Sequence, residues 1–249
     1  MATLLAIETS TTVCSVALAV DGKVVLARED HTGASHAALL GVFVADAADY
    51  ARANRLKISA VAVSSGPGSY TGLRIGMSEA KGLCYGWDVP LIAIPTLKIL
   101  ASQVLPLPFA FQPVNFQAYQ PSLPVPYPAP LLCPMIDARR MEVYAAIYDE
   151  ELDEIRPAQA DIIDENSYQE YLENNPVFFL GNGSDKCRAV ISSPNARFLP
   201  NIFPAAQAMF PLAEAAFANQ DFADTAYCEP FYLKEFQTTV PKNGLAHHS

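Results

Sequence analysis

Near the start of the chain, the apolar positions fall into short runs that predict β-strands. Residues 3–9, 13–20 and 23–28 are rich in aliphatic and β-branched side chains, and Asp21 and Gly22 between the last two runs are typical of a tight hairpin. Two further apolar runs, at 58–64 and 90–94, predict strands, the first of them buried on both faces.

Helical periodicity separates these strands. Between residues 35 and 54 the apolar side chains recur three and four residues apart, and Ser35 is positioned to cap the first turn. Residues 70–87 and 96–104 predict two more helices. The order β-β-β-α-β-α-β-α mixes an antiparallel hairpin with parallel crossovers, unlike dinucleotide-binding folds and TIM barrels. It predicts an α/β protein of the actin-like, ribonuclease-H-like (ASKHA) fold, with two half-domains of mixed sheets flanked by helices.

Residues 105–130 interrupt this pattern, because about every third residue is proline and a regular helix or central strand cannot form. Strands are predicted again at 131–137, 142–148 and 177–180, and helices at 165–174 and 205–219. We therefore expect an N-terminal half-domain (1–104), a Pro-rich insertion (105–130) and a smaller C-terminal half-domain (131–204). A helix (205–220) is expected to pack back on the first half, before a strand-like segment and tail (221–249).

Composition narrows the function classes. The net charge is -10, and the basic residues are scattered, which disfavours direct nucleic-acid binding. Five cysteines, widely separated and never in a C-x-x-C pair, fit neither a disulfide framework nor a zinc site. The start lacks a basic region, and Lys98, Gln103 and several prolines interrupt the most apolar stretch (89–114). We expect a cytoplasmic protein without membrane contact.

The sequence SSGPGSYTGLRIG, at 64–76, has two interpretations. A Gly-rich turn that opens a helix directs backbone N–H groups at an anion. However, the spacing misses the dinucleotide fingerprint by one residue, and no lysine follows Gly72 as a P-loop requires. In the packing interpretation, which we favour, Gly66, Pro67 and Gly68 form the loop turn, while Gly72 and Gly76 lie on one helix face that another element approaches closely. Nucleotide binding stays an alternative.

Four motifs carry a resemblance: LAIETSTTVCSVAL (5–18), SSGPGSYTGLRIGMSEAKGL (64–83), IDARRMEVYAAIY (136–148) and EPFYLKEF (229–236). In this order they resemble the TsaB family, formerly YeaZ. The resemblance implies a subunit of the bacterial machinery that makes N6-threonylcarbamoyladenosine beside the anticodon of tRNAs. It also implies a catalytically silent relative of the ligase subunit TsaD that binds and supports TsaD, with TsaE and tRNA reached only through the complex.

The same resemblance allows a test of catalytic silence. TsaD-like proteins place two metal-binding histidines just after the strand that here ends near residue 94, whereas this chain has PTLKILA at 95–101. Thr, Leu and Lys cannot replace imidazole ligands. His31 and His36 are more simply a loop residue and a helix-start residue than a metal pair. We expect no metal and no cofactor.

Glu8, Thr9, Ser10 and Thr11 are interpreted as a vestigial phosphate loop, and Asp137 as a second acid at the end of a strand. Two alternatives remain from these residues. One is a nucleotide held weakly at the subunit boundary. The other is a small-molecule kinase or ATPase of the actin-like fold.

If the chain binds TsaD, the resemblance implies that the two N-terminal helices form the interface, because related subunits pair there. In the absence of TsaD the same patch would join two copies in an isologous homodimer. Packing on the chain's own sheet is the alternative for every residue of the patch. The residues predicted to contact the partner are Leu39, Leu40, Phe43, Ala47, Tyr70, Leu73, Gly76 and Met77.

Overall fold

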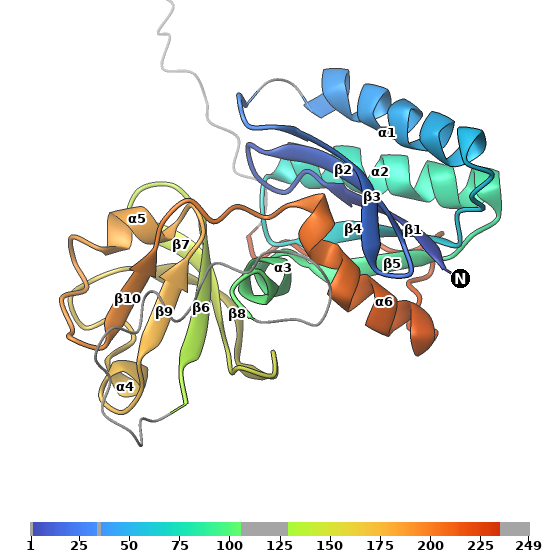
Figure 1. Ribbon diagram of the computed structural model, residues 1–249. Coiled ribbons are helices and arrows are strands. Elements are labelled where there is room, and N and C mark those ends of the chain that lie inside the picture. Colours follow the sequence, from blue (N-terminus) through green and yellow to red (C-terminus); the bar gives the residue numbers. More distant parts are fainter. Residues whose placement is uncertain (1, 34–35, 106–128, 235–249) are drawn as a thin grey trace, which may run out of the picture.

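The computed structural model describes residues 2–33, 36–105 and 129–234, which form two lobes with one five-stranded sheet each (Figure 1). In the N-terminal lobe the strand order is β3-β2-β1-β4-β5. β1 pairs antiparallel with β2 and parallel with β4. The strands are β1 (Thr3–Glu8), β2 (Cys14–Val20), β3 (Lys23–Asp30), β4 (Ala60–Gly66) and β5 (Leu91–Pro95).

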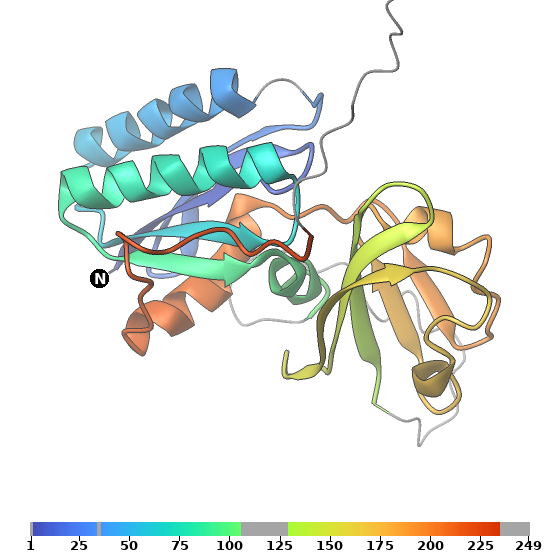
Figure 2. The same cartoon turned by 180° about the vertical axis from the view of Figure 1, so that it is seen from behind.

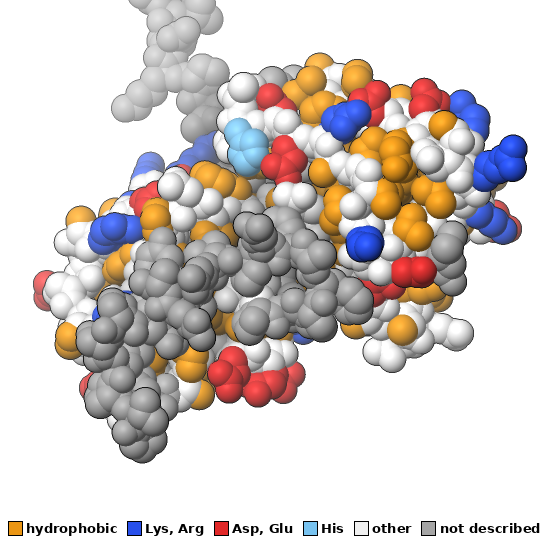
Figure 3. Space-filling view, viewed as in Figure 1, with side chains coloured by type: hydrophobic (Ala, Val, Ile, Leu, Met, Phe, Trp, Pro, Cys, Tyr) orange, Lys and Arg blue, Asp and Glu red, His pale blue; other side chains and the backbone are white. Residues whose placement is uncertain are grey.

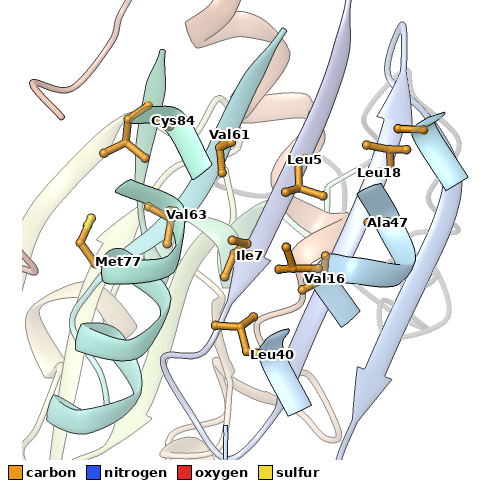
Figure 4. Close-up of a cluster of buried hydrophobic side chains, with 14 of the residues drawn as sticks. Leu5, Ile7, Val16, Leu18, Leu40, Ala47, Val61, Val63, Met77 and Cys84 are labelled. Atoms are coloured by element: carbon orange, nitrogen blue, oxygen red, sulfur yellow. The ribbon is translucent and has the colours of Figure 1, made fainter. Parts of the chain in front are cut away.

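Alternating side chains give this sheet two apolar faces. Helices α1 (His36–Ala53) and α2 (Tyr70–Trp87) cover one face and pack on larger side chains such as Leu5, Ile7 and Val63 (Figure 4). Because residues two apart in a strand share a face, the positions between them point to the other side. That side is covered by the 3-10 turn η2 (Ala206–Met209) and by α6 (Phe210–Ala218).

The opposite face of the N-terminal sheet is lined mostly by alanines, which allow η2 and α6 to lie close to the strands. The segment predicted at 205–220 therefore packs on the first lobe. Helix α3 (Thr96–Ser102) lies between the lobes. Its Leu97 and Leu100 belong to the core of the C-terminal lobe, while Ile99 belongs to that of the N-terminal lobe.

The C-terminal lobe has the strand order β10-β9-β6-β7-β8 and only short helices. Its large apolar side chains, such as Phe178 and Phe179, point to opposite faces of the sheet. The elements are β6 (Leu131–Asp137), β7 (Glu142–Tyr148), β8 (Glu154–Ile162), α4 (Gln169–Leu172), β9 (Val177–Leu180), α5 (Ser184–Cys187) and β10 (Ala196–Leu199).

The predicted fold class is confirmed, and the element order of the first lobe is the predicted one. Three local predictions differ from the structure. β8 and β10 were not predicted, and the helix expected at 165–174 is reduced to α4, which follows Tyr168 at a φ of 63°. Among the described residues of 221–234, the strand-like character is limited to one bridge between Leu91 and Ala223. Ser35, residues 106–128 of the Pro-rich insertion and the chain from 235 lie outside the described residues.

Candidate functional site

Two glycines of α2 bring this helix against the loop that follows β1. A Cβ on Gly72 would lie 2.1 Å from the carbonyl oxygen of Thr9, and one on Gly76 would lie 2.2 Å from Thr9 Oγ1. Thr9 Oγ1 donates a hydrogen bond to the Gly72 carbonyl at 2.8 Å. The turn before the helix is equally close, because Ser69 N donates to the Ser10 carbonyl at 2.6 Å. The glycine-rich motif thus serves a close contact inside the chain.

Glu8, the last residue of β1, is completely buried beneath this contact. Its Oε1 accepts hydrogen bonds from Ser10 N at 2.5 Å and from Ser64 Oγ at 3.1 Å. Its Oε2 has no hydrogen-bond partner among the described residues. Burial raises the pKa of Glu8 to about 7, although the hydrogen bonds from Ser10 and Ser64 act in the opposite direction. The carboxyl group therefore lies in the packing of the first lobe and is not presented to solvent.

The rest of the predicted phosphate loop is also largely buried, and Ser10 and Thr11 line the cleft between the lobes. Thr9 and Ser10 are 0% exposed and Thr11 is 6% exposed. His36 Nε2 donates to the carbonyl of Thr11 at 2.7 Å, which ties the start of α1 to the same loop. His31 lies beside Glu29, with 3.1 Å between Nε2 and Oε2, so each histidine has a partner of its own. Among the described residues, no group of three or more His, Cys, Asp or Glu side chains is arranged to hold a metal ion.

A cleft of about 540 Å³ separates the two lobes. Hydroxyl-bearing residues of the first lobe, including Thr12 and Ser69, face the β6–β7 hairpin of the second lobe, including Asp137 and Arg139. Of the predicted loop turn at 66–68, Pro67 and Gly68 line the first-lobe wall of the cleft. The cleft therefore lies where the Gly-rich loop, the end of β1 and the end of β6 come together.

Both acids of the hairpin are paired with lysines. Lys186 Nζ donates to Asp137 Oδ1 and to the carbonyls of Arg140 and Glu142, and Lys234 Nζ donates to Glu142 Oε1. Lys186 and Lys234 are distant from their acids in the sequence, and no local pattern indicated them. With these partners, the carboxylates of the cleft are charge-compensated within the chain.

The predicted partner-contact residues divide into two groups. Five lie in the core beneath α1 and α2, and three are partly exposed, which leaves a partner access to only these three unless the helices move. The interface as a whole stays a prediction. The buried residues are Leu40, Ala47, Leu73, Gly76 and Met77, and the partly exposed ones are Leu39, Phe43 and Tyr70.

The outward surface of the two helices carries small and apolar residues that the sequence prediction missed. On α1, Val42 is 56% exposed and follows Gly41; on α2, Tyr85 is 89% exposed and lies three residues after Gly82. A Cβ on either glycine would have nothing within 4 Å. The signal was present in the sequence, because these residues occupy the side of each helix opposite the apolar stripe.

Two surface properties bear on the class of partner. In the part of the chain that the structure describes, no helix has both the length and the hydrophobicity needed to cross a membrane. On the face seen in Figure 3, acidic and basic side chains of the described residues are interspersed, and no continuous basic patch forms there. The lack of a continuous basic patch on this face agrees with the net charge of -10.

Comparison with known proteins gives one family match. The family model described as TsaD, tRNA N6-adenosine threonylcarbamoyltransferase, matches residues 30–237. Curated relatives include the tRNA threonylcarbamoyladenosine biosynthesis protein TsaB of Bacillus subtilis, 29% identical over 54% of this chain and 51% of that protein. The protein of the same name from Escherichia coli is 39% identical over 39% of this chain and 42% of that protein. The match thus spans about half the length of these relatives or less.

Solved structures extend the similarity over the whole fold. A Pseudomonas aeruginosa structure, titled as an uncharacterized protein with similarity to peptidase YeaZ, has a TM-score of 0.73 and 27% identity, over 94% of this chain and 100% of that chain. A second structure, YeaZ from the same organism, has a TM-score of 0.72 and 26% identity with the same coverage.

Proposed function

Since this chain belongs to the TsaD family, and within it to the TsaB (YeaZ) branch, we propose that it acts in the biosynthesis of threonylcarbamoyladenosine in tRNA as a non-catalytic subunit that binds TsaD. The observation that carries the binding role is the outward surface of α1 and α2. Catalysis of the transfer belongs to TsaD in this proposal, and TsaE and tRNA are reached through the complex.

The outward surface supports the binding role because its glycines have no purpose inside the chain. Glycine in the interior of a helix costs about 0.5–1 kcal/mol relative to alanine. Gly72 and Gly76 offset this cost by close packing on Thr9, whereas Gly41 and Gly82 face open space. Small residues on an exposed helix face allow the backbone of a second helix to approach closely. In the absence of TsaD, a second copy of this chain is expected to occupy the surface.

Three observations support catalytic silence. The family resemblance places metal-binding histidines in the segment that forms α3, but here Leu97 and Leu100 of α3 are 0% exposed in the core and Thr96 Oγ1 accepts a hydrogen bond from Gly66 N. Glu8 is buried. The acids of the cleft are paired with lysines, which compete with Mg²⁺ for the carboxylates.

The proposal is tested by reconstituting threonylcarbamoyl transfer with purified TsaD, TsaE and tRNA, with and without this chain. We expect transfer only when the chain is present, and no ATP turnover by the chain alone. Transfer of the same rate without the chain would contradict the proposal. ATP hydrolysis or phosphorylation of a small molecule by the isolated chain would favour the kinase or ATPase alternative.

The surface is tested with a matched pair of charge substitutions. Val42→Glu introduces a carboxylate on the outward surface of α1, and Ile162→Glu does so at the end of β8, where the isoleucine is 78% exposed. We expect Val42→Glu to weaken TsaD binding by about 2 kcal/mol, roughly thirtyfold, and Ile162→Glu to leave it unchanged. Calorimetric titration measures both, and circular dichroism verifies folding. Equal effects of the two substitutions would exclude this surface.

A further inference from the structure

The chain does not end at α6 but returns along the first lobe to the cleft (Figure 2). Ala223 N donates to the carbonyl of Leu91 at 2.9 Å, so the segment begins beside β5, the edge strand of the sheet. Lys81 of α2 then donates to the carbonyls of Ala226 and Cys228, at 3.0 and 3.1 Å. The last described residues, Glu229–Lys234, are called the C-terminal strap below.

The strap is fastened to the first lobe at the Gly-rich loop. Phe231 N donates to the Ser65 carbonyl at 2.7 Å, and the rings of Tyr232 and Tyr70 lie 4.9 Å apart with an interplanar angle of 35°. At Gly66, whose φ is +110°, a Cβ would lie 2.4 Å from the carbonyl oxygen of Phe231. Glycine at this position therefore leaves space for the strap, and any larger residue would push the strap away.

At its other end the strap reaches the second lobe. Lys234 Nζ pairs with Glu142 Oε1 of β7, and Phe231 to Lys234 form part of the wall of the cleft. Three other described elements join the lobes: α3, whose side chains enter both cores, Leu212 of α6, which packs against both, and the backbone that leads from β10 to η2. A lobe that is joined to the other at a single packed junction rotates about that junction. A second attachment, at a distance from the junction, prevents the rotation.

Surface contacts hold the strap, since none of its residues is buried. The strap has no helix or strand, Phe231 is 50% exposed, and the side chain of Lys234 is 41% exposed. Segments held by few buried contacts open locally at a much lower free energy than the core around them. We propose that the C-terminal strap is an inter-lobe latch: while it is docked it fixes the lobes and closes one wall of the cleft, and its release lets the second lobe rotate about α3.

The latch is tested by NMR on the full ¹⁵N-labelled chain. Lys234→Met and Glu142→Gln each remove the ion pair, and their combination measures whether the two act together. Arg28→Met is the matched control, because Arg28 forms a comparable ion pair with Asp46, each 44% exposed, away from the strap. The readouts are hydrogen exchange of the Phe231 amide and residual dipolar couplings of both lobes.

We expect Phe231 exchange to rise about fivefold in either single variant, no further rise in the double variant, and no rise in the control. We also expect one alignment tensor to describe both lobes of the original chain, and the fit of a single tensor to both lobes to worsen in Lys234→Met as the undocked population grows. Unchanged exchange at Phe231 would overturn the latch. Faster exchange with couplings that still fit one tensor would also overturn it, because the strap would then be mobile without governing the lobes.

Discussion

In both lobes a central strand pairs antiparallel with the next strand and parallel with the fourth. β1 pairs with β2 and β4 in this way, and β6 pairs with β7 and β9. The edges correspond as well, since β3 and β8 close one side and β5 and β10 the other. Even the turn after the fourth strand repeats, with Gly66 at a φ of +110° and Gly181 at +92°. The lobes are thus two copies of one topology.

The lobes differ in what covers these sheets. α1 and α2 have 18 residues each, whereas α4 and α5, at the corresponding places, have four each. The corresponding acids differ too, because Glu8 is buried at the end of β1 and Asp137 lies at the cleft at the end of β6. The comparison shows that the first lobe has two long helices with an outward surface, while the second has little beyond its sheet.

The largest predicted effect concerns a polar cluster in the second lobe, which lacks long helices. Asp161 accepts hydrogen bonds from Arg156 Nη1 at 3.2 Å and from Tyr168 Oη at 2.6 Å, and the side chains of Arg156 and Asp161 are only 16% and 17% exposed. Asp161→Asn leaves a largely buried guanidinium without its counter-charge. We expect a loss of about 3 kcal/mol in the free energy of unfolding, measured by urea denaturation.

The control for this cluster lies in the first lobe. Asp46→Asn breaks the exposed pair with Arg28, and we expect a loss below about 1 kcal/mol. If the two substitutions cost the same, the polar cluster would not be what stabilises the short-helix lobe, and the contrast between the lobes would lose its energetic basis.

A smaller effect, with a change of sign, separates the two faces of α2. Gly72→Ala places a methyl group against the Thr9 backbone, and we expect it to destabilise the chain by about 2 kcal/mol. Gly82→Ala meets nothing within 4 Å and is expected to stabilise it by up to about 1 kcal/mol, through helix propensity. Thermal unfolding of the isolated variants measures both. Destabilisation by Gly82→Ala would mean that the outward glycine has a role inside the chain.

The sequence predicts the first lobe better than the second, for physical reasons. Long helices and buried strands leave a repeating apolar pattern, and the bounds of α2 were predicted to the residue. β8 contains Pro157 and exposed polar residues because it is an edge strand, so its pattern is weak. The pairs of the cleft have no local signal, since Lys186 lies 49 residues from Asp137 and Lys234 lies 92 residues from Glu142.

The candidate site shows the same limit. The Gly-rich loop and the acid at the end of β1 were found from sequence, because a glycine-rich turn that opens a helix and an acid at the end of a strand are features of phosphate sites. What the glycines contact, the loop at Thr9, became visible only when two segments separated by more than sixty residues were brought together. The apolar stripe of each helix indicated its core, and the surface that we propose for the partner lies on the side that this criterion discards.

A pH-dependent effect tests the contrast between the two strand-end acids. The pKa of Glu8 is raised from 4.5 to about 7 by burial, so the folded chain keeps this proton at pH values where the unfolded chain has lost it. Stability therefore falls as the pH rises from about 4.5 to about 7 and stays low above that range. Glu8→Gln removes this dependence, and we expect a gain of about 2 kcal/mol at pH 8 and little change at pH 4.5.

Asp137→Asn, at the corresponding place in the second lobe, is expected to change stability by less than about 1 kcal/mol at either pH, because its carboxylate is 45% exposed. Urea denaturation at the two pH values compares the variants, and an equal response to pH would show that the two acids experience the same environment after all.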